Sequence, residues 1–148
     1  MRARSKERAR ESLGMAEAGS TGGTVVLDAS AILALLYGEP GQEEIRRRLR
    51  GTEVRVGAVN LSEVAAKLAE AGFEETESRE AVGALSAVVH AFDEDLAYAA
   101  GQLRPETRDR GLSLGDRACL ALARSLGVCA LTTDKVWDGL PGAEVIHR

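Results

Sequence analysis

From Thr24 onward, short apolar runs alternate with longer segments that favour helix. The strand-like runs, rich in β-branched residues, are residues 24–28, 53–60, 88–92, 128–133 and 143–147. The segments with helical spacing or helix-favouring composition are residues 30–38, 41–50, 61–72, 77–89, 93–103 and 113–127. Because strand and helix alternate throughout this region, the pattern predicts an α/β fold with a mainly parallel sheet, helices on both faces and right-handed crossovers.

Size and composition fit one domain with an aliphatic core. The chain has 148 residues, of which 45% are hydrophobic and only 3% aromatic. No apolar run approaches the roughly 18 to 20 residues of a membrane span, and the N-terminal segment lacks the apolar centre of a signal peptide. We therefore expect a cytoplasmic protein. Cys119 and Cys129 lie in apolar segments without nearby ligand-like His or Cys spacing, which predicts reduced thiols, with no zinc site and no disulfide.

The first 23 residues differ from the rest. Residues 1–10 carry five basic residues and one acid, whereas the whole chain has a net charge of −4, so the remainder is acidic. No completed apolar stripe follows, and the segment ends in Ser, Thr and Gly. We predict a flexible basic and polar tail over residues 1–23 and one folded domain over residues 24–148. The tail is most simply a solvated arm, although it could touch RNA, and a translation start at Met15 stays open.

Four acidic residues stand where predicted strands end or predicted helices begin. Asp28 and Asp134 follow strands, and Glu63 and Asp116 fall in the first turns of helices. In an open parallel sheet, the carboxyl ends of the strands and the starts of the next helices share one edge, so we expect the four side chains there. Four carboxylates in a partly dry cleft would repel one another strongly, which indicates a bound cation.

The ligand types indicate which cation is expected. Carboxylate oxygens without His or Cys suit Mg²⁺ or Mn²⁺, which keep several waters and share their remaining positions with a substrate phosphate. Such a site can lower the pKa of a bound water, orient that water toward a phosphodiester and stabilise the charge on the leaving oxygen. The pattern therefore predicts metal-dependent hydrolysis of nucleic acid.

Each acid also has a local explanation. Asp28 and Asp134 could cap or turn the segments that follow them, and Ser113 with Asp116 fits a capping box. Glu63 lies opposite an apolar stripe and could be an ordinary solvated glutamate. What favours a shared site is the coincidence of four acids, each at a strand end or a helix start.

Four stretches carry a resemblance to a known family. They are VVLDASAILALLYGEPG, VNLSEVAAKL, GLSLGDRACLALARSLG and ALTTDKVW. In this order they resemble the four acidic motifs of the PIN domain family, and in particular its VapC-like toxin ribonucleases. The resemblance covers residues 24–148. It implies a three-layer α/β/α sandwich with a parallel central sheet and a metal-dependent endoribonuclease.

The resemblance also implies residue roles. The acidic quartet would be Asp28, Glu63, Asp116 and Asp134. Asp28 and Asp116 would be the metal ligands, with the other two acids completing the cluster and orienting water.

Neighbouring residues could support these acids. Ser30 and Thr132 match small hydroxyl positions where they could donate to the carboxylates, and Asn60 could act similarly. Local turn and cap bonds explain the two hydroxyls equally well. Arg117, adjacent to Asp116, is our candidate for a contact with a substrate phosphate.

Partners follow from the resemblance as well. VapC-like toxins usually pair with a small VapB-like antitoxin and usually form homodimers, so we expect an RNA substrate, an antitoxin and a second copy of this chain. The apolar segments 30–38, 64–68 and 82–89 are candidate contact surfaces, although core packing explains them as well.

Two other function classes compete with a nuclease. A non-catalytic PIN-like module that binds RNA or protein is the main alternative, although such a module has no need to tolerate the repulsion of four acids. A phosphoaspartate receiver or an aspartate-nucleophile phosphatase is disfavoured, because LDAS lacks an Asp-x-Asp motif and no paired acids lie near the N-terminus. No glycine-rich phosphate loop of the G-x-x-x-x-G-K type is present.

Overall fold

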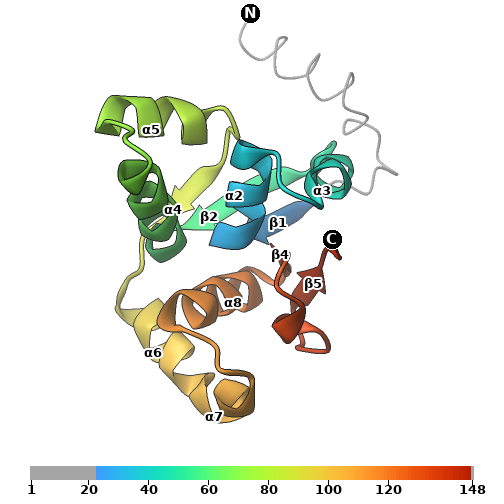
Figure 1. The fold of residues 1–148 in the computed structure, drawn as a ribbon. Helices are drawn as coiled ribbons and strands as arrows, with labels where there is room; N and C mark the ends of the chain where they lie inside the picture. The colour runs from blue at the N-terminus through green and yellow to red at the C-terminus, as the bar shows by residue number, and fades with distance from the viewer. Residues whose placement is uncertain (1–22, 148) are drawn as a thin grey trace, which may run out of the picture.

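A five-stranded parallel sheet forms the centre of the molecule (Figure 1). The computed structural model describes residues 23–147. The strands are β1 (Thr24–Leu27), β2 (Glu53–Gly57), β3 (Val88–His90), β4 (Cys129–Thr132) and β5 (Ala143–Val145). They lie in the order β3-β2-β1-β4-β5, and every neighbouring pair is parallel. The predicted α/β class and parallel sheet are therefore confirmed.

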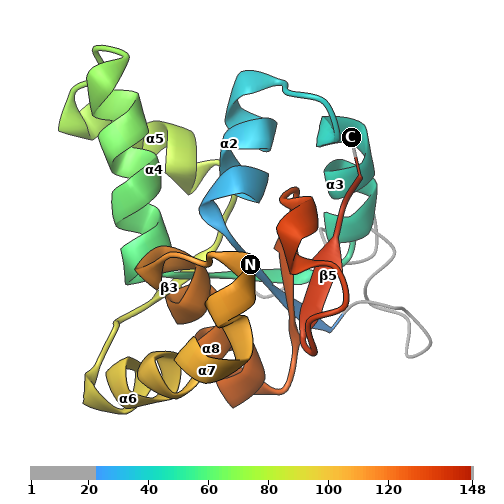
Figure 2. The same ribbon diagram turned by 60° about the horizontal axis from the view of Figure 1, so that its bottom comes forward.

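Helices cover both faces of this sheet (Figures 1 and 2). One face carries α2 (Ala29–Tyr37), α3 (Gln42–Leu49), α4 (Ala58–Glu70) and α5 (Glu75–Gly83). The other carries α6 (Glu94–Gln102), α7 (Arg104–Thr107) and α8 (Leu114–Leu126). Two short 3₁₀ turns, η1 (Arg108–Arg110) and η2 (Lys135–Trp137), complete the described elements. Within residues 23–147, no helix is long and apolar enough to cross a membrane.

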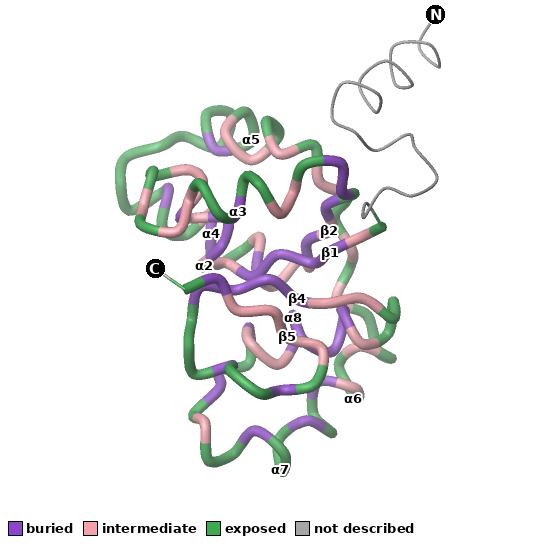
Figure 3. Tube along the Cα trace, turned by 90° about the vertical axis from the view of Figure 1, so that its right-hand side faces the viewer, coloured by how far each residue is buried: buried purple, intermediate pink, exposed green. Residues whose placement is uncertain are grey.

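The hydrophobic core has two halves, one on each side of the sheet. Successive side chains of a strand point to opposite faces, so Val25 and Leu27 pack under α2 and α4 while Val26 packs against α8. Figure 3 shows β1 and β4 buried at the centre of the molecule. Burying one such aliphatic side chain contributes about 1.5–3 kcal/mol. Because β1 is packed on both faces, the residue that follows it is held rigidly.

Several predicted boundaries were wrong. The strand expected over residues 53–60 ends at Gly57, and α4 begins at once, so Asn60 lies on a helix. The helix expected over residues 77–89 ends at Gly83, and Ser86 then adopts a left-handed conformation before β3. The short helix α7 was not predicted, since its four residues are too few to show a helical period.

The sheet order places a crevice at the carboxyl ends of β1 and β4. From β1 the chain builds outward through β2 to β3, and it then returns across the other face to β4 on the far side of β1. Connections therefore leave β1 and β4 in opposite directions, which is where ligands bind in open α/β sheets. Asp28 follows β1, and Thr132 ends β4.

Candidate active site

Asp28 is the most deeply held acid of the site. It directly follows β1, begins α2 as its N-cap residue and has only 3% of its surface exposed. Its Oδ1 accepts a hydrogen bond from the Ala31 N–H (2.8 Å) and another from the Ser30 hydroxyl (2.7 Å). Its Oδ2 accepts a bond from the Thr132 hydroxyl (2.5 Å). Three donors therefore fix the carboxylate at the crevice.

Hydroxyl groups join the end of β1 to the end of β4. The Ser30 and Thr132 hydroxyl oxygens lie 3.2 Å apart, and the Thr133 N–H donates to the Ser30 oxygen (3.0 Å). The Asp134 N–H donates to the Thr132 hydroxyl oxygen (3.0 Å). Ser30 and Thr132 thus both donate to Asp28. The local turn bonds that were the competing explanation are also present, since Ser30 bonds Asp28 two residues before it and Thr132 accepts from Asp134 two residues after it.

Glu63 reaches the site from α4 through a contact with α8. The Asn60 amide nitrogen donates both to Glu63 Oε1 (3.1 Å) and to the Gly115 carbonyl (3.1 Å). A Cβ atom built on Gly115 would lie 2.5–2.6 Å from the Glu63 carboxyl atoms, closer than real Cβ contacts come. The bare glycine backbone therefore lets the Glu63 carboxylate rest against the start of α8. The Asn60 Oδ1 is buried without a hydrogen-bond partner in the described part of the chain.

Asp116 and Asp134 both cap helical turns as predicted, and each uses only one of its two carboxylate oxygens to do so. Asp116 forms a capping box with Ser113, whose N–H donates to Asp116 Oδ2 (2.9 Å). Asp134 Oδ1 accepts from the Val136 N–H (3.0 Å). Among residues 23–147, the second oxygen of each carboxylate has no protein partner, and the same holds for Glu63 Oε2. Capping and metal binding are therefore compatible roles.

The charge of Asp116 acts on two neighbouring acids. Burial raises the pKa of Asp28 to about 6, despite the hydrogen bonds from Thr132, Ala31 and Ser30, and the charge of Asp116 adds to the rise. The pKa of Glu63 is also raised, first by burial, against the Asn60 hydrogen bond, and again by Asp116. Carboxylates whose pKa values rise in this way are ones that a cation would stabilise.

Behind these acids lies a buried thiol. Burial raises the pKa of Cys119 well above its usual range, and the charges of Asp28, Asp116 and Glu63 add to the effect. A thiol that stays protonated is neither a nucleophile nor a metal ligand. Both Cys119 and Cys129 are free thiols.

The donor set meets the chemical requirements of a hard divalent cation. Among residues 23–147, no three His, Cys, Asp or Glu side chains are spaced to enclose an ion as they stand. Mg²⁺, however, is usually bound by only one or two carboxylates and otherwise by water and substrate oxygens. Asp28 and Asp116 offer carboxylate oxygens at one edge, and Asp28 is desolvated. The residues present therefore fit such an ion.

Arg117 lies differently from the acids. One of its guanidinium nitrogens donates to the Ala100 carbonyl at 3.4 Å in α6, and its Nε is buried without a hydrogen-bond partner among the described residues. The side chain is half-buried against α6, which leaves less of it available to a substrate than an exposed arginine would offer.

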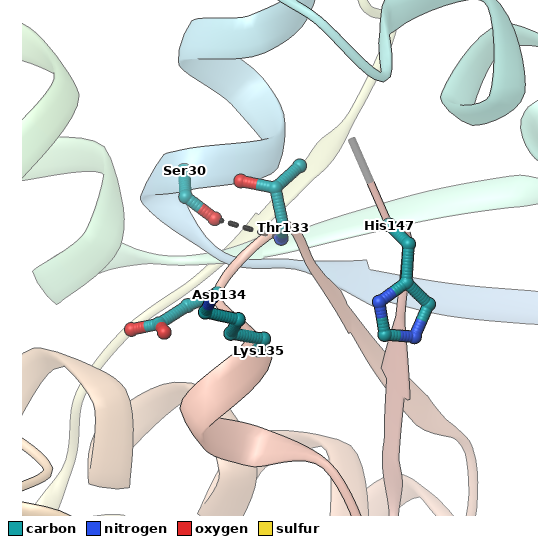
Figure 4. Close-up of a pocket in the computed structure, with 5 residues that line it drawn as sticks. All are labelled: Ser30, Thr133, Asp134, Lys135 and His147. Atoms are coloured by element: carbon teal, nitrogen blue, oxygen red, sulfur yellow. Dashed lines mark hydrogen bonds between the residues drawn. The ribbon is translucent and has the colours of Figure 1, made fainter.

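An open hollow of about 620 Å³ adjoins the acids (Figure 4). Its lining residues are Ser30, Thr133, Asp134, Lys135 and His147. In Figure 4 the Asp134 and Lys135 side chains leave the same turn in opposite directions, and Lys135 extends toward the side on which His147 lies. Neither Lys135 nor His147 was predicted from the sequence as a site residue. The available signal was that Lys135 follows an acidic motif and that His147 follows the last strand.

The fold and the site define an α/β protein with acids gathered at the carboxyl edge of a parallel sheet. The sequence matches the model of the PIN domain family over residues 25–142. This chain belongs to the PIN domain family. A search of curated proteins found no match.

Solved structures share this fold. A toxin–antitoxin complex from Klebsiella pneumoniae is 18% identical, with a TM-score of 0.69 over 84% of this chain and 98% of that chain. VapC20 of Mycobacterium tuberculosis, a toxin that cleaves the sarcin–ricin loop, is 19% identical, with a TM-score of 0.65 over 83% and 99%. VapBC2 from Rickettsia felis, bound to promoter DNA, is 14% identical, with a TM-score of 0.65 over 82% and 98%. At these identities the likeness concerns the fold.

Proposed function

We propose that this protein is a metal-dependent endoribonuclease and the toxin of a VapBC-type pair. The observation that carries the proposal is the state of Asp28, a buried carboxylate whose pKa is raised to about 6 and which shares its edge with Asp116 and Glu63. In the part of the chain that the structure describes, no cationic side chain forms an ion pair with these three carboxylates. Membership of the PIN family and the toxin structures that share its fold support a ribonuclease toxin.

In this proposal each acid has a stated task. Asp28 and Asp116 would hold one Mg²⁺ or Mn²⁺ ion, with the Ser30 and Thr132 hydroxyls fixing the orientation of Asp28. Glu63 and Asp134 would accept hydrogen bonds from water and orient it toward the scissile phosphodiester. When bound, the ion supplies Lewis-acid stabilisation of the charge that develops during hydrolysis. Asn60 would keep Glu63 against α8.

Cleavage of structured RNA tests the proposal. Purified protein, free of any bound inhibitor, is incubated with a panel that includes tRNAs in Mg²⁺ or Mn²⁺, and with chelator. We expect metal-dependent cutting at discrete positions. Asp116→Asn removes a ligand charge while keeping the capping geometry, so we expect a loss of at least about 100-fold in rate.

A matched variant separates site from fold. Asp95 is an exposed residue in the first turn of α6 with no hydrogen bond or ion pair among the described residues. Asp95→Asn should cut like the wild type. If the folded wild type cuts no RNA of the panel with either metal, a non-catalytic binding module becomes the better account.

The proposal includes two partners. The complexes from Klebsiella pneumoniae and Rickettsia felis contain antitoxins, and this chain shares their fold. An apolar hollow of about 510 Å³ between α4 and α5, with Leu61, Ala65 and Val82 in its wall, offers a surface to such a protein or to a second copy of this chain. A short protein encoded beside this gene should co-purify with it and inhibit cutting. Light scattering should give the mass of a dimer.

A further inference from the structure

The hollow beside the acids has a lysine and a histidine in its wall. Asp134 and Ser30 line its side toward the acidic cluster, whereas Lys135 contributes an ammonium group and His147 an imidazole ring that can donate a hydrogen bond. The rest of this edge carries negative charge from Asp28, Glu63 and Asp116. A strand of RNA that lies across the acidic cluster therefore meets a positive charge at Lys135 and a hydrogen-bond donor at His147 in the adjoining hollow.

The Lys135 ammonium is available to a ligand. Lys135 is exposed in η2, and its side chain has no hydrogen bond or ion pair with any residue between 23 and 147. The backbone around it is nevertheless fixed, because Asp134 caps η2 and Trp137 is fully buried in the core. The lysine thus stands on a rigid turn directly after an acid of the site.

His147 is only weakly engaged elsewhere. Its Nε2 lies 3.6 Å from Asp138 Oδ1, and the two side chains are 68% and 54% exposed. A pair that is this long and this exposed contributes little to stability. The residue directly before it, Ile146, is anchored by the bond from its N–H to the Thr132 carbonyl (2.8 Å), which ties this end of the chain to β4.

We propose that Lys135 and His147 bind a phosphate of the RNA strand that flanks the bond to be cut. The inference rests on the proposed function, and it assigns substrate positioning to two residues outside the acidic quartet. An ammonium and an imidazole on a rigid edge suit a phosphate oxygen, which accepts charge-assisted hydrogen bonds. The hollow is open enough to admit the backbone of a nucleotide chain.

RNA binding by a silenced enzyme tests the inference. In an Asp116→Asn background with chelator, the affinity for a fluorescently labelled tRNA is measured by anisotropy between 50 and 300 mM salt. Lys135→Ala combined with His147→Ala should weaken binding about tenfold at low salt. The slope of log affinity against log salt concentration should become less steep by about 1 for each phosphate that is no longer neutralised. Lys135→Arg alone, with His147 unchanged, should keep most of the wild-type affinity.

A charge-matched control accompanies the double variant. Arg79→Ala removes one positive charge on α5, where the side chain is 78% exposed and, among residues 23–147, pairs only with Glu75. It should leave both the affinity and the salt slope close to wild type. In the active enzyme, the double variant should raise KM with kcat unchanged, because the phosphate is bound equally in the ground and transition states.

The outcomes separate the two claims. If tRNA is cut and bound but the Lys135 and His147 variants behave like Arg79→Ala, the substrate-positioning role is wrong while the proposed function stands. If the wild type neither binds nor cuts tRNA or any other RNA of the panel, both are wrong. A double variant that melts several degrees lower but keeps the wild-type salt slope would also contradict the inference.

Discussion

The position of the Glu63 carboxylate depends on residue 115 being a glycine, which has no Cβ atom. A Cβ on Gly115 would come within 2.5 Å of Glu63 Oε2, so Gly115→Ala must displace the glutamate. The helix itself should tolerate the change, since alanine favours helix over glycine by about 1 kcal/mol. We therefore expect a folded variant whose RNA cleavage rate falls about 100-fold, the cost of misplacing a catalytic group by about 1 Å.

Gly101→Ala is the matched control for this prediction. Gly101 lies in α6, and a Cβ built there meets nothing within 4 Å. The control variant should cut RNA at the wild-type rate and melt at the same temperature or slightly higher. Equal cleavage rates for the two glycine variants, measured on the same tRNA, would mean that Glu63 does not contribute to catalysis.

The raised pKa of Asp28 predicts how stability depends on pH. Its folded-state pKa is about 6, against 3.8 as the usual value, so the folded protein holds this proton more tightly than the unfolded chain. The resulting stabilisation is complete below pH 3.8 and is lost as the pH rises through about 6. By linkage the effect is about 3 kcal/mol of unfolding free energy. Asp28→Asn should therefore melt at a higher temperature than the wild type at pH 8 in chelator.

The measurement is a pair of thermal melts at pH 5 and pH 8. The difference between wild type and Asp28→Asn should widen at pH 8 by several degrees, because one kcal/mol shifts the melting temperature of a domain this size by about 4 °C. Adding Mn²⁺ at pH 8 should then raise the wild-type melting temperature and leave the variant unchanged. A wild type that ignores Mn²⁺ at millimolar concentration would argue against Asp28 as a ligand.

At this scale the sequence indicated the acids but not the contacts that orient them. Asp28 and Asp134 follow apolar strand-like runs, so their shared edge could be predicted from topology alone. The contact of Glu63 with Gly115 joins α4 to α8, which are far apart in the sequence, and no local pattern reports it. The phosphate contact expected of Arg117 stays a prediction, and the sequence did not indicate that its guanidinium also donates to the Ala100 carbonyl in α6.

At the scale of elements, the hydrophobic pattern located the strands better than it located their ends. β2 ends at Gly57, where the chain turns at once into α4, but Ala58 and Val59 continue the apolar character of the strand. The boundary is set by the sheet, because a parallel strand stops pairing where its neighbours stop. This shift places Asn60 and Glu63 on the same helix, three residues apart and on one face, which is what lets the amide hold the carboxylate.

The short elements α7, η1 and η2 could not be predicted for a different reason. They are three to four residues long and are held by contacts that are distant in sequence, such as the two bonds between the Arg124 guanidinium and the Glu106 carboxylate (3.0 and 2.7 Å). Periodicity needs a longer window than these elements provide. One of them, η2, carries Lys135, so this residue was missed for the same reason as the element on which it lies.

At the scale of the whole molecule, the net charge does not favour binding to nucleic acid. The chain has a net charge of −4, which slows non-specific association with nucleic acid. A substrate is then held only where a cation or a bound metal offsets that charge. In the two proposals above this edge of the sheet meets the condition, with a metal held by Asp28 and Asp116 and with Lys135 in the wall of the adjoining hollow.

The part of the fold that the structure describes begins at Gly23. The Gly23 carbonyl accepts a bond from the Glu53 N–H (2.9 Å), and among residues 23–147 both halves of the core lie between Val25 and Ile146. The match to the PIN family likewise begins at residue 25. A protein that starts at Gly23, after an initiating methionine, should therefore melt within about 2 °C of the full chain and cut RNA with the same kcat.

Residues 1–22 lie outside the described residues, so the predicted tail stays a prediction, and the same truncation tests what it contributes. Residues 1–10 carry five basic side chains and one acid. If they contact RNA, the shortened protein will show a higher KM at 50 mM salt, and the difference will vanish near 300 mM because counterions screen such contacts. An unchanged KM at low salt would make residues 1–22 a solvated arm. A melting temperature lower by more than about 5 °C would mean instead that the segment packs on the domain, contrary to the prediction.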